Sequence, residues 1–285
     1  MLKGFTVQNW KKKIIGFPCE DSYNLYNRNN IIFLLAVADG ITRDCLNGAV
    51  ADSSIEGIKN IFLHYPRPSP AKIASDIFTK TFPEVIKDFI NKNDLAIKEA
   101  FKESNKRIRK WNENNFSKRD YLANDFAGCV ASGAIINKEF MYWGYIADCG
   151  VAVFDSEGKL RFKTNDEGPS KFYKQRWSDE RMKNLKWKDD EARIITRRDY
   201  RNNINNPCSY GALTGEEEAM EYVRVGGEVV HNGECIITYS DGLEPIIFSG
   251  GFSNELKRRN IKGLEKLCKK GVKSEGSLII SSANQ

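Results

Sequence analysis

Two Asp-Gly pairs are the residues of this sequence best placed to do chemistry, because each ends a short apolar run. Asp39-Gly40 follows IIFLLAVA, and Asp241-Gly242 follows CIITYS. Such runs are typical of strands buried on both faces. A buried carboxylate needs a partner, and carboxylate and carbonyl oxygens are the ligands that hard divalent cations prefer. One Asp-Gly pair is also a common hairpin turn, but two indicate carboxylates that converge on shared cations.

The composition is that of a globular protein with a sizeable core. The 285 residues are 41% hydrophobic and 29% charged, which is ordinary for such a protein. The net charge of +6 fits phosphorylated or nucleic-acid partners. The run Lys11-Lys12-Lys13 fits a solvated turn or a phosphate contact. No apolar segment approaches the roughly 18 residues of a membrane span, and the first residues lack the apolar centre of a signal peptide, so no membrane partner is expected.

The cysteine and histidine content excludes several kinds of active site. The seven cysteines have no paired spacing, which predicts reduced thiols and a cytoplasmic protein. None has an arginine six positions later, so the loop of cysteine-dependent phosphatases is absent. Two histidines are too few for a His-rich metal site. The basic residues are scattered among acids, which argues against a nucleic-acid binder.

Strands and helices are both predicted around the two Asp-Gly pairs. Residues 5–10 and 31–42 are predicted strands, and the next helix carries its apolar face on Val50, Ile58, Ile61 and Phe62. After a rigid connector at 65–70, a second helix is capped by Asn93 or Asp94. Further along the chain, four strands at 129–137, 140–148, 150–155 and 159–164 are predicted to form an antiparallel meander. A charged excursion from the core follows at 165–209. The last predicted elements are a short helix within 210–223, a basic helix at 256–270 and a strand at 277–281.

The order of short motifs resembles the PPM family of metal-dependent Ser/Thr protein phosphatases, the protein phosphatase 2C type. The motifs are EDS at 20–22, AVADG at 36–40, IADCG at 146–150, SYGALTGEEEA at 209–219, SDGL at 240–243 and SLIIS at 277–281. The resemblance covers nearly the whole chain. It implies one α+β domain over 1–285, a four-layer α-β-β-α sandwich of two antiparallel sheets, with 165–209 as a flap beside the active site.

The resemblance also implies a centre of two Mg²⁺ or Mn²⁺ ions, with a third ion near it. Asp39 would bridge both cations, and the Gly40 carbonyl would bind one of them. Asp241 would hold a cation from the opposite sheet. Asp21, with Glu20 beside it, would accept hydrogen bonds from water on the cations. Asp21, Asp39 and Asp241 are therefore the predicted catalytic residues.

Three positions depart from the family's motifs. Ile41-Thr42-Arg43 stand where the family has His-Gly-Gly, so the histidine that protonates the leaving oxygen is missing and water would serve instead. The phosphate-binding arginine expected before Glu20 falls near Gly16, which leaves Lys13 or Arg43 as its substitute. Ala147-Asp148-Cys149-Gly150 replaces Gly-Asp-Ser-Arg, and Asp148 matches the acidic residue that helps to bind the third metal.

The tail departs most from the family. Ser274-Glu275-Gly276-Ser277 stands where the family has Asp-Asn or Asp-Asp before its final strand. Matching Ser277 to the family's threonine puts Ser274 at the ligand position and Glu275 one place away. Because glutamate is one methylene longer than aspartate, Glu275 is predicted to be a compensating metal ligand. The alternative is a solvated turn residue.

The predicted function is hydrolysis of phosphoserine and phosphothreonine by a water that two cations share and activate. The substrate would be a phosphorylated protein, a Ser/Thr kinase or its target. An alternative from another class keeps the fold without turnover: a regulatory module that binds phosphoproteins through a weakened metal site.

Overall fold

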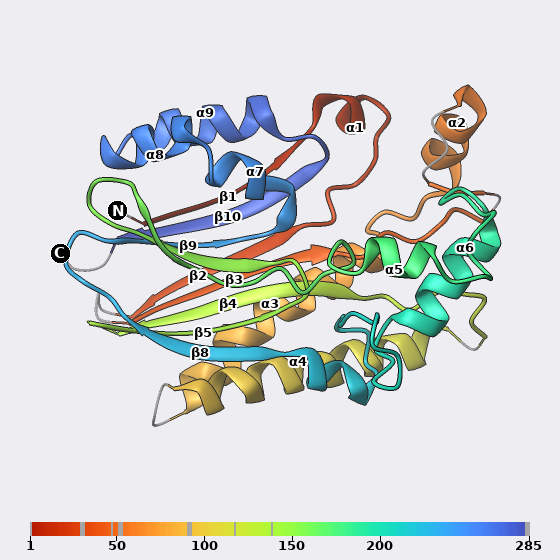
Figure 1. Cartoon of the computed structure of the whole chain (residues 1–285), viewed down its shortest axis with the longest axis horizontal. Coiled ribbons are helices and arrows are strands. Elements are labelled where there is room, and N and C mark those ends of the chain that lie inside the picture. Colours follow the sequence, from red (N-terminus) through yellow and green to blue (C-terminus); the bar gives the residue numbers. More distant parts are fainter. Residues whose placement is uncertain are drawn as a thin grey trace.

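Two five-stranded antiparallel sheets pack face to face, with helices on both outer faces (Figure 1). This computed structural model describes residues 2–28, 32–46, 48–50, 54–89, 93–116, 118–137 and 139–282. The first sheet has the strand order β1(Leu2–Gln8), β10(Glu275–Ser282), β9(Cys235–Tyr239), β6(Gly150–Phe154), β7(Leu160–Lys163). The second has the order β2(Ser22–Arg28), β3(Ile32–Gly40), β4(Cys129–Asn137), β5(Phe140–Ile146), β8(Arg224–Val229). The predicted four-layer α-β-β-α sandwich is confirmed.

The helices form the two outer layers and one end of the molecule (Figure 1). The second sheet is covered by α3(Pro70–Asp88) and α4(Asp94–Asn115), and the first by α7(Glu244–Ile247), α8(Gly250–Lys257) and α9(Ile261–Gly271). The remaining helices are α1(Trp10–Ile14), α2(Ile55–His64), α5(Tyr173–Trp177), α6(Asp190–Ile195), η1(Thr196–Tyr200), η2(Glu217–Tyr222) and η3(Asp241–Leu243). Because α5 and α6 lie at the end toward which β3 runs, residues 165–209 stand beside the end of that strand. We call this segment the flap.

Side-chain alternation along β3 and β10 divides the core into layers. On β3, Leu34 and Ala36 pack against α3 and α4, whereas Leu35 and Val37 face the other sheet. On β10, Leu278 faces the helices and Ile279 the space between the sheets. Since successive strand residues point to opposite faces, every second residue of each strand points into the space between the sheets.

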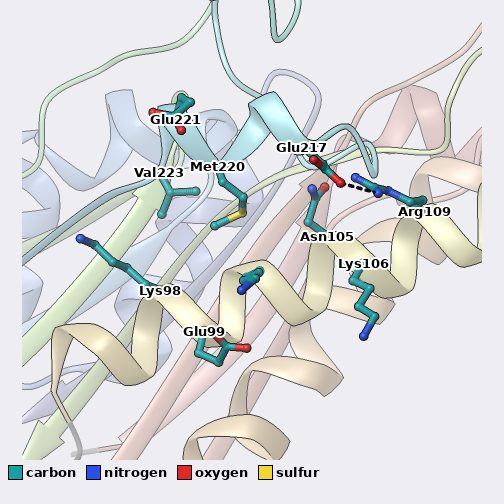
Figure 2. A pocket seen from close by; sticks show the side chains of 10 residues that line it. Lys98, Glu99, Asn105, Lys106, Arg109, Glu217, Met220, Glu221 and Val223 are labelled. Atoms are coloured by element: carbon teal, nitrogen blue, oxygen red, sulfur yellow. Dashed lines mark hydrogen bonds and ion pairs between the residues drawn. The ribbon is translucent and has the colours of Figure 1, made fainter.

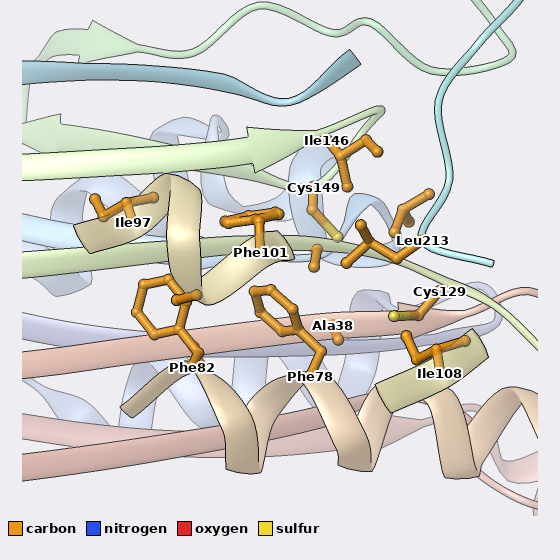
Figure 3. Packing of buried hydrophobic residues seen from close by; sticks show 14 of the residues in the cluster. Ala38, Phe78, Phe82, Ile97, Phe101, Ile108, Cys129, Ile146, Cys149 and Leu213 are labelled. Atoms are coloured by element: carbon orange, nitrogen blue, oxygen red, sulfur yellow. The ribbon is translucent and has the colours of Figure 1, made fainter. Parts of the chain in front are cut away.

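Aromatic rings fill the layer between the second sheet and its helices. The rings of Phe78 and Phe82 on α3 lie beside Phe101 of α4, and the Phe78 and Phe101 centroids are 4.9 Å apart (Figure 3). Tilted and edge-on aromatic pairs of this kind stabilise a core beyond the area they bury. Asn93 accepts a hydrogen bond from the backbone of Ala96 and caps α4 as predicted.

Several predicted elements were wrong in extent or in pairing. Helix α3 was missed, because the stretch 65–70 was interpreted as a connector whereas Ser69 caps this helix and Pro70 begins it. The helix with Ile58 and Ile61 excludes Val50, since it begins at Ile55. The basic helix is two helices, α8 and α9.

The predicted meander is also wrong, because the chain changes sheet between β5 and β6. The strands β4 and β5 pair within the second sheet, whereas β6 and β7 pair within the first. Ala147 has a positive φ of 63°, which ends β5 and turns the chain away from its neighbour. Asp148 therefore lies at the crossing between the sheets. No described helix has the length and hydropathy that a membrane crossing requires.

Candidate metal centre

Strand alternation brings three predicted site residues together at one end of the space between the sheets. Asp39 continues the face of Leu35 and Val37 on β3, and Glu275 begins the face of Ile279 on β10. Among the described residues, Asp39, Glu275 and Asp21 each offer a carboxylate oxygen, and these oxygens lie within 4.8 Å of one another. We call these three residues the acidic cluster. Carboxylates at this spacing are suited to a divalent cation.

The glycines of the two Asp-Gly pairs are required by close backbone approaches. A Cβ on Gly242 would lie 1.7 Å from the carbonyl oxygen of Glu275, and one on Gly40 would lie 2.7 Å from the backbone of Ala71 at the start of α3. Real Cβ atoms do not tolerate such distances, so no other residue fits without moving the neighbouring element. Each glycine therefore lets a second segment pack directly against the strand end that carries its aspartate.

Burial and mutual repulsion oppose the ionisation of these carboxyls. Burial, Glu275 and Asp241 raise the pKa of Asp21 to about 7, against hydrogen bonds that lower it. Burial, Asp21 and Asp241 raise the pKa of Asp39 well above its ordinary value. Burial and Asp241 raise the pKa of Asp148 to about 7. A bound cation would reverse this effect, because an adjacent positive charge favours the ionised form.

An unpartnered buried oxygen also supports a cation at this place. Asp21 is buried, and Ser240 donates to its Oδ2 at 2.6 Å, but its Oδ1 has no hydrogen-bond partner among the described residues. Ser240 is itself fixed to the other sheet, since the Ser277 backbone N–H donates to its Oγ at 2.9 Å. A buried polar atom without a partner is uncommon and needs an explanation. The donor set around Asp21 thus fits divalent metal ions.

The other predicted ligands border this cluster. Asp241 is exposed and lies close enough to Asp39 to raise its pKa. Asp148 is half-buried, at the chain's crossing between the sheets. The Gly40 backbone and Asp148 line one cavity together with Asp39.

Glu20 stands apart from the acidic cluster and faces three hydroxyl groups. Tyr65 donates to its Oε1 at 2.6 Å, and Ser69 and Thr42 donate as well. Burial raises the pKa of Glu20 to about 7, although these hydrogen bonds lower it. Because its oxygens are occupied, Glu20 ties the segment before β2 to the start of α3 and to the loop after β3.

Lys12 is a cation beside the acidic cluster, and no motif in the sequence distinguishes it from Lys11 and Lys13. Its Nζ lies 3.6 Å from Oε1 of Glu275. The two residues predicted to replace the family's phosphate-binding arginine have other surroundings. Lys13 is exposed on α1. Arg43 donates to the Asp125 carbonyl at 2.9 Å, and its guanidinium stacks on the ring of Phe116. The run Lys11-Lys12-Lys13 is the only sequence signal that points to Lys12. Which of the three lysines faces the site depends on how α1 packs, so the run alone could not identify it.

Two cavities meet at Asp39. One, of about 390 Å³, includes Lys12, Asp241, Ser274 and Glu275; we call it the metal-side cavity. The other, of about 460 Å³, extends from Asp39 and Asp148 under the flap; we call it the flap cavity. A substrate in either cavity can therefore approach the acidic cluster.

Buried ion pairs fix the flap to the two segments that flank β3 and β4. Arg193 of α6 donates to Asp44 at 2.7 Å, and Arg197 donates to the same carboxylate at 3.2 Å. Arg201 makes two hydrogen bonds of 2.8 Å to Asp125. Burial raises the pKa of Asp125, but Arg201 and Arg197 outweigh it, so the pKa lies below its ordinary value. The roof of the flap cavity is thus held by charge pairs that water does not screen.

A larger cavity, of about 770 Å³, lies elsewhere, between α4 and η2 (Figure 2). Its wall carries several lysines and glutamates, and Arg109 pairs with Glu217 at 2.9 Å across it. The acidic cluster contributes no residue to it. The volume of a cavity therefore does not identify the candidate site, and we interpret this cavity as a solvated part of the surface.

No family model and no curated protein sequence matches the chain. Solved structures match over its full length. They include the catalytic domain of the serine/threonine phosphatase PstP with two manganese ions (16% identity, 99% of this chain, 97% of that chain, TM-score 0.59), the S. agalactiae serine/threonine phosphatase (13%, 100%, 99%, 0.61) and RsbX with magnesium (12%, 100%, 100%, 0.55).

The chain has the fold of these phosphatases. The resemblance stated from the motifs is therefore confirmed for the fold, over the whole chain. At identities of 12–16%, the likeness shows the sandwich and leaves the site residues to be argued from this chain's own geometry.

The tail of the phosphatase-like fold gives a first prediction, on Glu275. Glu275→Gln removes a charge from the acidic cluster, so the Mn²⁺ concentration for half-maximal binding should rise about 10- to 100-fold. Ser274→Asp adds a carboxylate to the metal-side cavity and should lower it. Calorimetric Mn²⁺ titration measures both. Glu157→Gln, at an exposed ion pair with Lys257, is the control, and an unshifted Glu275→Gln curve would remove this residue from the site.

Proposed function

We propose that this protein is a metal-dependent phosphatase that hydrolyses phosphoserine and phosphothreonine in proteins. The observation that carries the proposal is the convergence of Asp21, Asp39 and Glu275 at one end of the space between the sheets. Oδ1 of Asp21 is buried there and has no hydrogen-bond partner in the part of the chain that the structure describes. The fold, which is that of Ser/Thr phosphatases, supports the same reaction class.

The residues that would hold the metal ions lie around Asp39. Asp39 and Glu275 would bind as carboxylates, Gly40 through its carbonyl, and Asp241 from the start of η3. Asp148 would serve a third ion beside the flap cavity. Mg²⁺ or Mn²⁺, when bound, lowers the pKa of water and offsets negative charge on a phosphoryl group.

The protein's own groups position the reactants around that centre. Asp21, held by Ser240, can accept a proton from water through its free Oδ1. Lys12, whose ion pair with Glu275 is long at 3.6 Å, lies where its charge can contact a phosphoryl oxygen. Glu20 holds the loop after β3 in place through Thr42. Together these groups orient a phosphoester without forming a covalent bond to it.

The natural substrate on this proposal is a phosphorylated protein, a Ser/Thr kinase or its target. The two cavities together suit a phosphorylated segment of polypeptide, because Asp39 lines both. Aryl phosphates, which are smaller, should enter as well and give a convenient assay.

Metal dependence and thiol independence test the proposal together. Purified protein should hydrolyse p-nitrophenyl phosphate in Mn²⁺, stop in EDTA, and recover when Mn²⁺ is restored. Alkylation by iodoacetamide should leave the rate within about twofold, because no cysteine belongs to the acidic cluster and burial raises the pKa of the nearby Cys149 and Cys19 thiols. Activity that survives exhaustive chelation would reject the proposal. Phosphopeptide binding without hydrolysis would favour the regulatory module instead.

A further inference from the structure

Arg176 is a buried cation at the wall of the flap cavity. It lies on α5 and is 4% exposed. Its Nη1 donates to the Cys208 carbonyl at 3.3 Å, and its guanidinium lies 5.4 Å from the ring centroid of Tyr210 and 6.0 Å from that of Tyr200. A guanidinium has five N–H donors, so most of its hydrogen-bonding capacity is unused within the described part of the chain.

Within the described residues, no carboxylate forms an ion pair with Arg176, unlike the neighbouring arginines of the flap. Arg193, Arg197 and Arg201 each pair with a buried aspartate. The acidic groups that act on Arg176 are Tyr210, Cys208 and Tyr200, which are ordinarily neutral, and burial consequently lowers its pKa. A buried charge without an opposite charge is costly to maintain. An anion that enters the flap cavity would remove that cost.

Arg176 lies on α5 in the flap, whereas Asp39 lies near the end of β3 and Asp148 at the crossing between the sheets. Within the described residues, no hydrogen bond or ion pair joins Arg176 to either carboxylate. Arg176, Asp39 and Asp148 line the same cavity of about 460 Å³, so one extended ligand can contact the guanidinium and the edge of the acidic cluster together.

The wall of this cavity is mainly apolar and aromatic. It includes Pro169, Tyr173, Trp177, Met182, Trp187 and Tyr210. Of the two arginines that line the cavity, Arg197 pairs with Asp44. An apolar wall beside the other guanidinium, that of Arg176, fits a ligand with a hydrophobic body and an anionic end. A free phosphate or a fully polar peptide would leave this wall unfilled.

We propose that Arg176 selects phosphoprotein substrates that carry a second anionic group, a carboxylate or a second phosphate, close to the phosphorylated residue, with an apolar side chain between them. The inference rests on the proposed function and names the substrate class for that site. Arg176 forms a two-pronged ion pair with the second group, and the aromatic wall packs against the apolar side chain. Substrate binding thus neutralises the buried charge of the flap.

Peptide binding tests this without depending on turnover. The probes are peptides that carry a phosphonate, in which a methylene replaces the ester oxygen of phosphothreonine, next to leucine. One glutamate, or one phosphoserine, is moved through the three positions on either side. Affinities are measured by fluorescence anisotropy with the full chain in Mn²⁺. Arg176→Gln and Arg176→Lys are compared with Arg181→Gln, an exposed flap arginine that pairs with Asp179 and Asp199.

We expect the best glutamate or phosphoserine peptide to bind wild type about tenfold more tightly than the alanine peptide. Arg176→Gln should reduce that ratio to within twofold, Arg176→Lys should keep part of it, and Arg181→Gln should keep all of it. A preference for the phosphoserine peptide alone would identify the second group as a phosphate. Equal binding of all peptides by wild type, or an unchanged ratio in Arg176→Gln, would overturn the inference. So would an equal loss for every peptide, which would assign Arg176 to the phosphoryl group itself.

The same experiment separates this inference from the proposed function. If binding depends on the second anionic group and on Arg176 but no phosphoester is hydrolysed, the proposed phosphatase activity is rejected and the proposed role of Arg176 stands. If phosphopeptides are hydrolysed but bind equally with and without the second anionic group, the phosphatase activity stands and the role of Arg176 is rejected.

Discussion

Asp39→Asn should lower turnover of a phosphopeptide at least about 1,000-fold, which corresponds to about 4 kcal/mol of transition-state stabilisation. Asp39 lines both cavities, and its carboxylate oxygen lies within 4.8 Å of the oxygens of Asp21 and Glu275. An amide keeps the size of the side chain and removes the charge that a shared cation needs. Steady-state kinetics in saturating Mn²⁺ measure the loss.

The stability of the metal-free protein should move in the opposite direction. Burial and the neighbouring carboxylates raise the pKa of Asp39, so its ionised form opposes folding at neutral pH and the amide removes that opposition. Asp39→Asn should therefore raise the melting temperature in EDTA while it weakens Mn²⁺ binding. The control is Asp155→Asn, whose carboxylate accepts hydrogen bonds within the turn between β6 and β7 and should change turnover less than twofold. Near-wild-type rates in Asp39→Asn would reject the metal assignment.

Asp125→Ala should destabilise the fold by about 3–5 kcal/mol, because it leaves Arg201 charged and buried without its partner. Arg201 and Asp125 are both 1% exposed as side chains, and Arg197 lies 3.8 Å from the same carboxylate. The flap should also lose its anchor near β4, so that kcat/KM for phosphopeptides falls with the stability. Denaturant unfolding, followed by the far-ultraviolet signal, gives the free energy.

A second variant separates charge from packing in this pair. Asp125→Ala with Arg201→Met removes both charges and should be more stable than Asp125→Ala alone. The exposed pair between Lys257 and Glu157 is the control, and Lys257→Ala should cost less than about 1 kcal/mol. A loss from Asp125→Ala no larger than that of Lys257→Ala would show that the buried network does not hold the flap.

Part of the candidate site follows from the sequence through the alternation of side chains along a strand. The apolar run before Asp39 ends in a side chain whose direction follows from alternation along β3. The rule does not extend to Asp241, which lies past the end of β9 at the start of η3. Applied to 275–281, it puts Glu275 on the face of Ile279, between the sheets. Periodicity therefore indicates Glu275, which lies beside Asp21 and Asp39, whereas matching Ser277 to a family threonine favours Ser274.

The parts that sequence reasoning missed depend on packing between distant segments. Lys12 faces Glu275 because α1 packs beside the start of β10, which no local pattern reveals. Helix α3 had local signals, Ser69 as its cap and Pro70 at its first turn, but a cluster of prolines and Pro83 inside the helix concealed them. In the sequence, Arg176 is one cation among many in a charged segment. It differs from Arg193 and Arg201 in the structure, because it is buried and no described carboxylate forms an ion pair with it.

Phosphate release from a phosphothreonine peptide, measured against Mn²⁺ concentration, tests the central claim most directly. The account predicts no release in EDTA, saturable release as Mn²⁺ is added, and complete reversal on renewed chelation, because the clustered carboxylates need cations to act. Release that is independent of Mn²⁺ and Mg²⁺, or none at any concentration of either ion, would contradict it.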